Sequence, residues 1–285
     1  MNTIPEWRFL PFQTYNAFEN MAIDEAIFRL NHRKGTPPTL RFYGWSPPSI
    51  SLGYFQETFR EVDVETCRRE HIDIVRRPTG GKAVLHEHDI TYAVVAKEFN
   101  PLFPPDIRGT YRVISSCIAD ALSELGIEAE MAVEGRTSHN ESLKAACFSV
   151  PSQYELLVQK RKICGSAQVR SRGGFLQHGS ILLDFDPVKT CSVLLPHHDD
   201  REKHIEQLRK SVTSIYEHTG PTVTVANICH ALKKSFEKKL GIELAEGGLT
   251  PEEEVLKTQL MSDKYTSEKW NIEGKAIAYG YKDSH

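Results

Sequence analysis

Long apolar runs are missing from this sequence of 285 residues. None approaches the roughly 20 residues that a bilayer crossing needs, so we expect no membrane-spanning helix. The first eleven residues include Glu6 and Arg8 and lack the apolar centre of a signal peptide. We therefore expect a cytoplasmic protein without a membrane partner.

An excess of charge of one sign is also missing. The formal net charge is −3, with 35 Lys and Arg against 38 Asp and Glu. Nucleic-acid-binding domains are usually basic, so the charge balance gives no reason to expect a nucleic-acid partner. Hydrophobic residues make up 40% and charged residues 26% of the chain, which is ordinary for a soluble globular protein.

Paired cysteines are absent as well. Six cysteines occur at irregular spacing, and no two form a CxxC motif: they stand at positions 67, 117, 147, 164, 191 and 229. Metal and disulfide frameworks normally show closer clustering. In a reducing cytosol we expect free thiols, most of them small buried apolar residues and at most one or two chemically active.

The order of the apolar patterns indicates an α+β fold. Short β-rich runs and helical periodicities alternate irregularly up to about residue 186, and helical patterns follow one another after it. The predicted strands are 7–10, 39–45, 49–54, 72–77, 90–96, 127–133, 154–158, 162–169 and 174–184. The predicted helices are 16–33, 62–71, 110–125, 203–218, 223–240 and 251–265.

The segment 76–86, RRPTGGKAVLH, is the most informative part of the chain. Adjacent glycines allow positive φ and let a ligand approach the backbone without meeting a Cβ. Amides exposed at such a turn can hold an anion or a carbonyl oxygen. A plain hairpin turn between the predicted strands 72–77 and 90–96 is the alternative interpretation.

Four blocks of sequence, taken together, resemble the biotin/lipoate protein ligase superfamily, and within it the bacterial octanoyltransferase branch. They are residues 41–45, 76–86, 147–157, and 162–168 followed by 176–183. The resemblance extends over about residues 5–272. It implies a mixed or antiparallel sheet core, with a ligase-type catalytic domain at 34–248. The strand and helix within 5–33 would pack on that domain, and 249–285 would form a C-terminal helical extension.

The resemblance also implies an activity. Octanoyltransferases of this kind take an octanoyl group from octanoyl-acyl carrier protein and hold it as a cysteine thioester. They then pass it to a lysine of a lipoyl-type domain, typically the glycine cleavage H protein, in lipoate biosynthesis. No cofactor and no ATP are expected. Three basic segments are candidates for docking the two acidic protein partners: Arg68-Arg69, Arg76-Arg77 and residues 160–162.

Two residues match the catalytic positions of the family. Cys147 stands where the family has its acyl-thioester cysteine, and its thiolate would attack the carrier thioester and split the transfer into two steps. Lys162 is the second match. Its ammonium would either lower the pKa of the cysteine or stabilise the oxyanion, and the sequence does not separate these roles. Cys164 shares a strand face with Lys162 in the predicted pattern, and we interpret it as structural.

The remaining matched positions are expected to bind substrate. Arg77, Gly80 and Gly81 would form the wall around the acyl head, and Gly165 and Gly179 would let strands approach closely around the acyl chain. His86 is a polar pocket residue in this interpretation, as is His178. His86 also lies in a His-Glu-His-Asp run, but no third ligand has zinc-type spacing, so we expect no metal.

Three other activities stay open. The ATP-dependent lipoate and biotin ligases of the superfamily usually carry a third glycine where this chain has Lys82, but they share the lysine at position 162. An amidotransferase branch also uses a cysteine and moves octanoyl between two protein domains. A non-catalytic acyl-binding protein would keep the fold without forming a covalent adduct. Cys147 favours a transferase, because an adenylating ligase needs no nucleophilic thiol.

Overall fold

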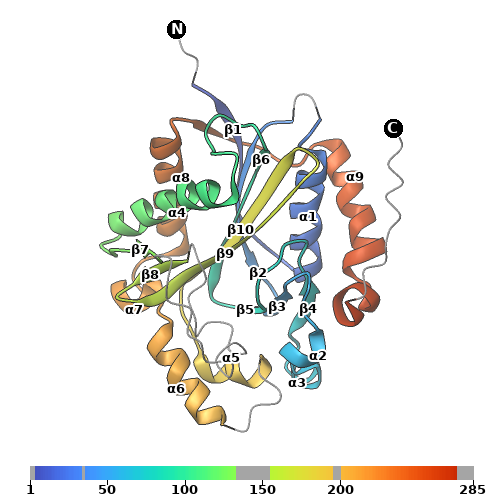
Figure 1. Ribbon diagram of the computed structural model, residues 1–285, viewed down its shortest axis with the longest axis vertical. Coiled ribbons are helices and arrows are strands. Elements are labelled where there is room, and N and C mark those ends of the chain that lie inside the picture. Colours follow the sequence, from blue (N-terminus) through green and yellow to red (C-terminus); the bar gives the residue numbers. More distant parts are fainter. Residues whose placement is uncertain (1–3, 34–35, 133–154, 195–199, 275–285) are drawn as a thin grey trace.

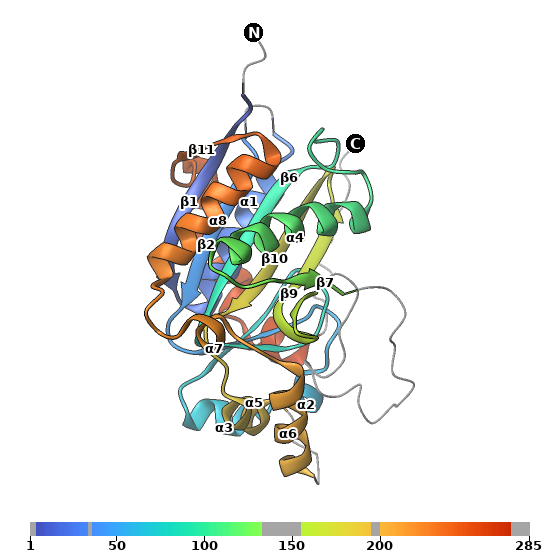
Figure 2. The same ribbon diagram turned by 90° about the vertical axis from the view of Figure 1, so that its left-hand side faces the viewer.

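The computed structural model describes residues 4–33, 36–132, 155–194 and 200–274. It confirms the α+β fold: a mixed eight-stranded sheet lies between α4 and α8 on one face and α1 on the other, and α9 packs outside α1 (Figures 1 and 2). A three-stranded sheet lies toward one end of the large one. None of the helices in the described ranges has the length and apolar composition that a bilayer crossing requires.

The strands are β1 (Glu6–Tyr15), β2 (Thr39–Trp45), β3 (Ser49–Leu52), β4 (Asp73–Arg76), β5 (Val84–His86), β6 (Asp89–Lys97), β7 (Glu130–Met131), β8 (Leu156–Val158), β9 (Arg161–Ser171), β10 (Gly174–Leu182) and β11 (Glu243–Glu246). The helices are α1 (Ala17–Leu30), α2 (Thr58–Glu61), α3 (Val64–Arg69), α4 (Ile107–Glu124), α5 (Pro187–Val193), α6 (Arg201–Ser211), α7 (Ile215–Thr219), α8 (Val225–Leu240) and α9 (Pro251–Leu260). Two π-helical turns follow, η2 (Met261–Tyr265) and η3 (Lys269–Glu273).

The large sheet runs in the order β11-β1-β2-β6-β10-β9-β8-β7. Strand β1 is parallel to β2 and β11, and the other pairs are antiparallel. Alternate residues of β6 face opposite sides: Tyr92 and Val94 pack with α4 and α8, while Ala93 and Val95 pack with α1. Because both faces are covered, β6 is apolar almost without interruption, as its sequence indicated.

The glycine turn does not close a hairpin, so that interpretation of residues 76–86 was wrong. Its flanking segments belong to different sheets: β4 is in the small sheet, with the order β4-β3-β5, and β6 is in the large one. Since β3 and β4 are parallel, the chain must cross the end of β3 to reach β5 on its far side. Residues 77–83 make that crossing and form the glycine loop.

The predicted helix 203–218 is two helices, α6 and α7. The chain between them is drawn out to meet β9: Val212 forms a bridge with Lys162, and the Thr213 amide donates to the Lys162 carbonyl at 2.9 Å. Amphipathic periodicity alone did not reveal this break, because each half has its own apolar face: Leu208 of α6 packs with Leu182 and Cys191, and Ile215 of α7 packs in the main core. The break fixes the backbone of β9 at the residue expected to be catalytic.

Helix α9 and the turn η2 pack along α1 (Figure 1). Arg8 and Glu253 form a buried ion pair with N–O distances of 2.5 and 2.8 Å, which joins β1 to α9. A boundary at residue 249 stays a prediction, as does the division at 34. The contacts do show that the C-terminal helices brace the core at the α1 face.

Candidate active site

A cavity of about 150 Å³ lies between the large sheet, β5 and the glycine loop. Its described wall carries apolar side chains, including Met21, Trp45 and Ala167, and a set of ionisable ones. The ionisable residues of the described wall are Tyr43, Arg77, Lys82, His86, Glu155, Lys162 and His178. An apolar cavity with a few convergent polar groups is the usual form of a small-molecule site.

Lys162 lies in this wall and is paired with a residue that the sequence did not single out. Its Nζ donates to Glu155 Oε1 at 2.5 Å, and both residues are 7% exposed. Glu155 comes directly before β8, on the opposite arm of the hairpin from Lys162. The ammonium of Lys162 therefore acts as one member of a buried ion pair.

A β-bulge in this hairpin separates Lys162 from Cys164. Leu157 pairs with Lys162 but Leu156 pairs with Cys164, so Ile163 is an extra residue on β9. The bulge interrupts the alternation of side chains, and for this reason the prediction that Cys164 shares a face with Lys162 was wrong. Cys164 packs in the hydrophobic core, where burial raises the pKa of its thiol to about 12.

Gly165 and Gly179 both line the cavity. A Cβ on Gly165 would lie 2.7 Å from Lys162 Cε, so this glycine leaves room for the lysine side chain. A Cβ on Gly179 would lie 2.6 Å from the Gly165 carbonyl oxygen, so β10 approaches β9 at a distance that no side chain permits. Two glycines on neighbouring strands thus set the position of Lys162 over the sheet.

The glycine loop contributes Arg77 and Gly81 to the cavity wall, but not Gly80. Gly81 has φ +92°, whereas a Cβ on Gly80 would meet nothing. Arg77 closes the loop by donating from its Nη2 to the Gly80 and Lys82 carbonyls, both at 3.0 Å. A Cβ on Gly53 would lie 1.9 Å from the Gly81 carbonyl oxygen, so Gly53 is required where the loop crosses β3.

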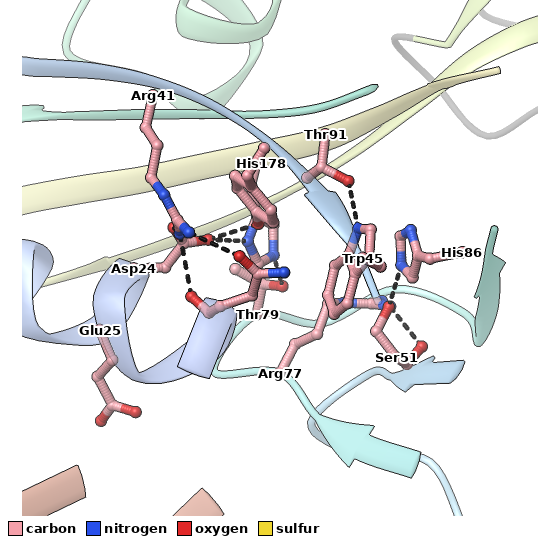
Figure 3. A network of polar contacts seen from close by, with 12 residues as sticks. Asp24, Glu25, Arg41, Trp45, Ser51, Arg77, Thr79, His86, Thr91 and His178 are labelled. Carbon is pink, nitrogen blue, oxygen red and sulfur yellow. Dashed lines mark hydrogen bonds and ion pairs between the residues drawn. The ribbon is translucent and has the colours of Figure 1, made fainter. Parts of the chain in front are cut away.

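His86 is held at both ring nitrogens, and Figure 3 shows the bond to Ser51. Ser51 Oγ accepts from Arg77 at 2.7 Å and lies 2.7 Å from His86 Nε2. His86 Nδ1 donates to Asp89 at 2.9 Å, because the carboxylate oxygen is an acceptor. Trp45 stacks on the imidazole with ring centroids 4.1 Å apart. The network makes His86 a fixed part of the wall.

His178 is fixed in the same way on the other side of Arg77 (Figure 3). Its Nδ1 donates to Asp24 at 3.0 Å, and Thr79 donates to its Nε2 at 2.7 Å. Burial lowers the pKa of His178, so the ring is neutral, although the bond to Asp24 acts in the opposite direction. Burial would raise the pKa of Asp24, but Arg41 at 2.6 Å and His178 outweigh it and hold that pKa below its ordinary value.

Arg76 does not form the docking patch that its sequence suggested. It is 1% exposed, and its guanidinium donates to backbone carbonyls of Gly53, Gln56 and Trp270. Asn271 accepts from its backbone amide at 3.0 Å. Arg76 is thus a structural residue that ties β4 and the base of the glycine loop to η3.

Cys147 lies outside the described residues. The other five cysteines are described, and burial raises the pKa of every one of their thiols, to about 12 for Cys67, Cys117, Cys164 and Cys229. Such thiols are poor nucleophiles at neutral pH, because the thiolate is the reactive form. Among the described residues, no group of three His, Cys, Asp or Glu side chains could hold a metal ion.

Comparison with known proteins agrees with this geometry. The family model described as "Lipoyl protein ligase A/B catalytic domain" matches residues 16–237, and the chain belongs to that family. Within the family it is similar to octanoyltransferase LipM of Geobacillus kaustophilus, with 41% identity over 271 residues, 93% of this chain and 98% of the relative.

Solved structures have the same fold. A lipoate-protein ligase A crystallised with ATP is 28% identical, with a TM-score of 0.77, and the match covers 94% of this chain and 98% of that one. A bi-partite lipoate protein ligase of Thermoplasma acidophilum, studied with its E2 lipoyl domain, is 27% identical with a TM-score of 0.79. That match covers 95% of this chain and 97% of the other.

Proposed function

We propose that this protein is an octanoyltransferase of lipoate biosynthesis, which moves an octanoyl group to a lysine of a lipoyl domain. The similarity to octanoyltransferase LipM over nearly the whole of both chains carries this conclusion. We further propose octanoyl-acyl carrier protein as the donor and the glycine cleavage H protein, or another lipoyl domain, as the acceptor, in the cytoplasm and without ATP. The lipoyl domain studied with the T. acidophilum ligase supports the class of acceptor.

Cys147 is the proposed nucleophile. The elevated pKa values of the five described thiols support this choice. So does its position eight residues before Glu155, which enters the cavity wall. The Cys147 thiolate attacks the carrier thioester, the carrier thiol leaves with a proton, and the octanoyl group remains as a thioester on the enzyme. The acceptor lysine then attacks this thioester and forms the amide.

The described cavity wall suits both steps. Arg77, Lys82 and Lys162 bring three cationic side chains to a cavity that is otherwise largely apolar. Positive charge beside a reacting thiol favours the thiolate, and it also stabilises the oxyanion of each tetrahedral intermediate. Apolar neighbours such as Met21 and Trp45 are suited to an alkyl chain.

Intact mass spectrometry after incubation with octanoyl-acyl carrier protein, without ATP, tests the proposal. Wild type should gain one octanoyl group, and Cys147→Ala should gain none while keeping its thermal unfolding midpoint. An unmodified wild-type protein, or an equal adduct on Cys147→Ala, would contradict the assignment of the nucleophile.

The second candidate is an ATP-dependent lipoate ligase. The likeness to the ligase crystallised with ATP favours it, and so does Lys162, because the ligases share a lysine at that position. Such an enzyme would exchange pyrophosphate with ATP in the presence of free octanoate or lipoate. Robust exchange would displace the transferase mechanism, whereas its absence together with an acyl-enzyme would support that mechanism.

A further inference from the structure

The second half of the proposed reaction needs a proton acceptor. A lysine side chain is an ammonium ion at neutral pH, because its ordinary pKa is about 10.4, and only the neutral amine can attack a thioester. One proton must leave the ammonium before the attack. The proposed function assigns the reaction to the described cavity, so the group that takes this proton has to belong to the cavity wall.

Both histidines of the cavity wall are already committed. His86 donates from Nδ1 to Asp89 and is hydrogen-bonded at Nε2 to Ser51. His178 donates from Nδ1 to Asp24 and accepts at Nε2 from Thr79. Neither ring directs a nitrogen lone pair into the cavity. Both histidines are 4% exposed, so the amine meets their rings as part of the wall.

Glu155 is the one acidic side chain among the described residues that line the cavity. The charged side chains that share the described wall with it are cations, namely Lys162, Arg77 and Lys82. Such surroundings repel an ammonium and favour its loss of a proton. They also leave Glu155 as the only anionic oxygen in the described wall with which the ammonium can form an ion pair.

The hairpin holds Glu155 firmly at the cavity wall. Its carboxylate is 2.5 Å from Lys162 Nζ, and the backbone of Lys162 is fixed by the bond from the Thr213 amide. The bulge at Ile163 aligns the two arms so that this pair forms. This carboxylate is buried and is the one acidic group of the wall that the structure describes, so it is placed to meet the acceptor ammonium rather than the surface of a partner protein.

We propose that Glu155 is the general base of the aminolysis step, an inference that rests on the proposed function. The acceptor ammonium gives one proton to the Glu155 carboxylate. The neutral amine attacks the thioester carbonyl, and the C–S bond breaks. The second nitrogen proton passes to the departing thiolate, which leaves a free thiol and an amide. Glu155 then returns its proton to water, so atoms and charge balance.

The assignment predicts opposite effects on the two half-reactions. Glu155→Gln keeps the size of the side chain and its acceptor oxygen for Lys162 but removes the negative charge. Lys162 then faces a neutral amide in place of the Glu155 carboxylate, so it stabilises a thiolate at least as well as before. Acyl-enzyme formation should proceed at wild-type speed or faster, while aminolysis should fall about 100-fold or more, the usual contribution of a general base.

The experiment follows the full-length chain by quenched-flow intact mass spectrometry. Enzyme is first loaded with octanoyl-acyl carrier protein and then mixed with a lipoyl domain, or with hydroxylamine as a second nucleophile. Hydroxylamine is largely uncharged at neutral pH and needs no base. The Glu155→Gln acyl-enzyme should therefore react with hydroxylamine at the wild-type rate and with the lipoyl domain slowly. Glu155→Asp, which restores a carboxylate, should recover part of the lysine reaction.

Glu217→Gln is the matched control. Glu217 pairs at 2.6 Å with Arg161, the neighbour of Lys162, but it does not line the cavity. Its variant should leave both half-reactions unchanged. If wild type and Glu155→Gln transfer octanoyl to the lipoyl domain at equal rates, Glu155 is not the general base. The same holds if the variant loses equal rate with the lipoyl domain and with hydroxylamine. Either result would leave the proposed function standing. A wild-type enzyme that forms no acyl-enzyme would overturn this inference together with the proposed function.

Discussion

The two walls of the cavity are built differently. On the glycine-loop side, His86 and His178 are each held at both ring nitrogens, and Arg77 closes the loop through backbone carbonyls. On the hairpin side, Lys162 and Glu155 face the cavity as a charged pair. The first wall is organised to keep one shape. The second brings opposite charges to the place where charge would develop and protons would move.

The largest expected effect comes from removing the cation of the hairpin wall. Lys162→Ala should slow acyl-enzyme formation by about 100-fold or more, because the charge that favours the thiolate and the oxyanion is lost. The deficit should be largest at low pH, where the thiolate is scarcest. Single-turnover mass spectrometry across pH measures it.

A control separates this chemical effect from instability. Lys162→Met leaves Glu155 buried without its cation, which typically costs about 3–5 kcal/mol. The double variant Lys162→Met/Glu155→Gln should recover much of that stability and yet form acyl-enzyme slowly. If Lys162→Ala formed acyl-enzyme at the wild-type rate at every pH, the charge on the hairpin side of the cavity would have no role in that step.

The next largest effect should come from a substitution on the glycine-loop side of the cavity. A Cβ on Gly53 would overlap the Gly81 carbonyl, so Gly53→Ala must push the glycine loop away from β3. We expect a loss of about 3 kcal/mol in the free energy of unfolding, measured in urea, and a slower transfer. Gly80→Ala is the matched comparison, since its Cβ meets nothing and it should change stability by less than about 0.5 kcal/mol. Equal losses in the two variants would show that the crossing is not tight.

The pH dependence of the free energy of unfolding should report on His178, which belongs to the glycine-loop side of the cavity. The folded pKa of His178 lies below its unfolded value, so the unfolded chain binds the extra proton first as pH falls. The contribution of His178 to the free energy of unfolding is complete above about pH 6.5. It is lost below that pH, by at most about 1.4 kcal/mol per pH unit. His178→Gln should flatten the fall of the thermal midpoint in this range. Asp24, whose folded pKa is also lowered, acts only below about pH 4.

The smallest effect should come from the outer side of the hairpin. Glu217 is 46% exposed where it meets Arg161, so Glu217→Gln should change the free energy of unfolding by less than about 1 kcal/mol. Urea denaturation is again the measurement. A larger loss would mean that the hairpin depends on its outer charges as well as on the pair inside the cavity.

The sequence predicted those parts of the site that depend on local patterns. Lys162, Arg77 and Gly81 were expected from the family resemblance that short blocks of sequence carry, and all three line the cavity. Helices such as α4 and α8 follow from the periodicity of a single stretch of chain.

The features that the sequence did not reveal depend on contacts between distant segments or on register. Glu155 meets Lys162 because of a bulge that no periodicity predicts. Its visible signal in the sequence was an acidic residue opposite Lys162, the family-matched lysine, on a short predicted hairpin. The bond between Asp24 and His178 joins residues 154 positions apart. The break between α6 and α7 exists because that segment bridges to β9.

The contact between Arg76 and η3 has a consequence for synthesis. Arg76, at the base of the glycine loop, bonds to Trp270, a residue 194 positions later in the chain. A ribosome must therefore make nearly all of the described chain before the loop gains its final anchor. A nascent chain that already contains the small sheet and the glycine loop still lacks this anchor, so we expect the loop to gain its final support only after Trp270 has left the ribosome.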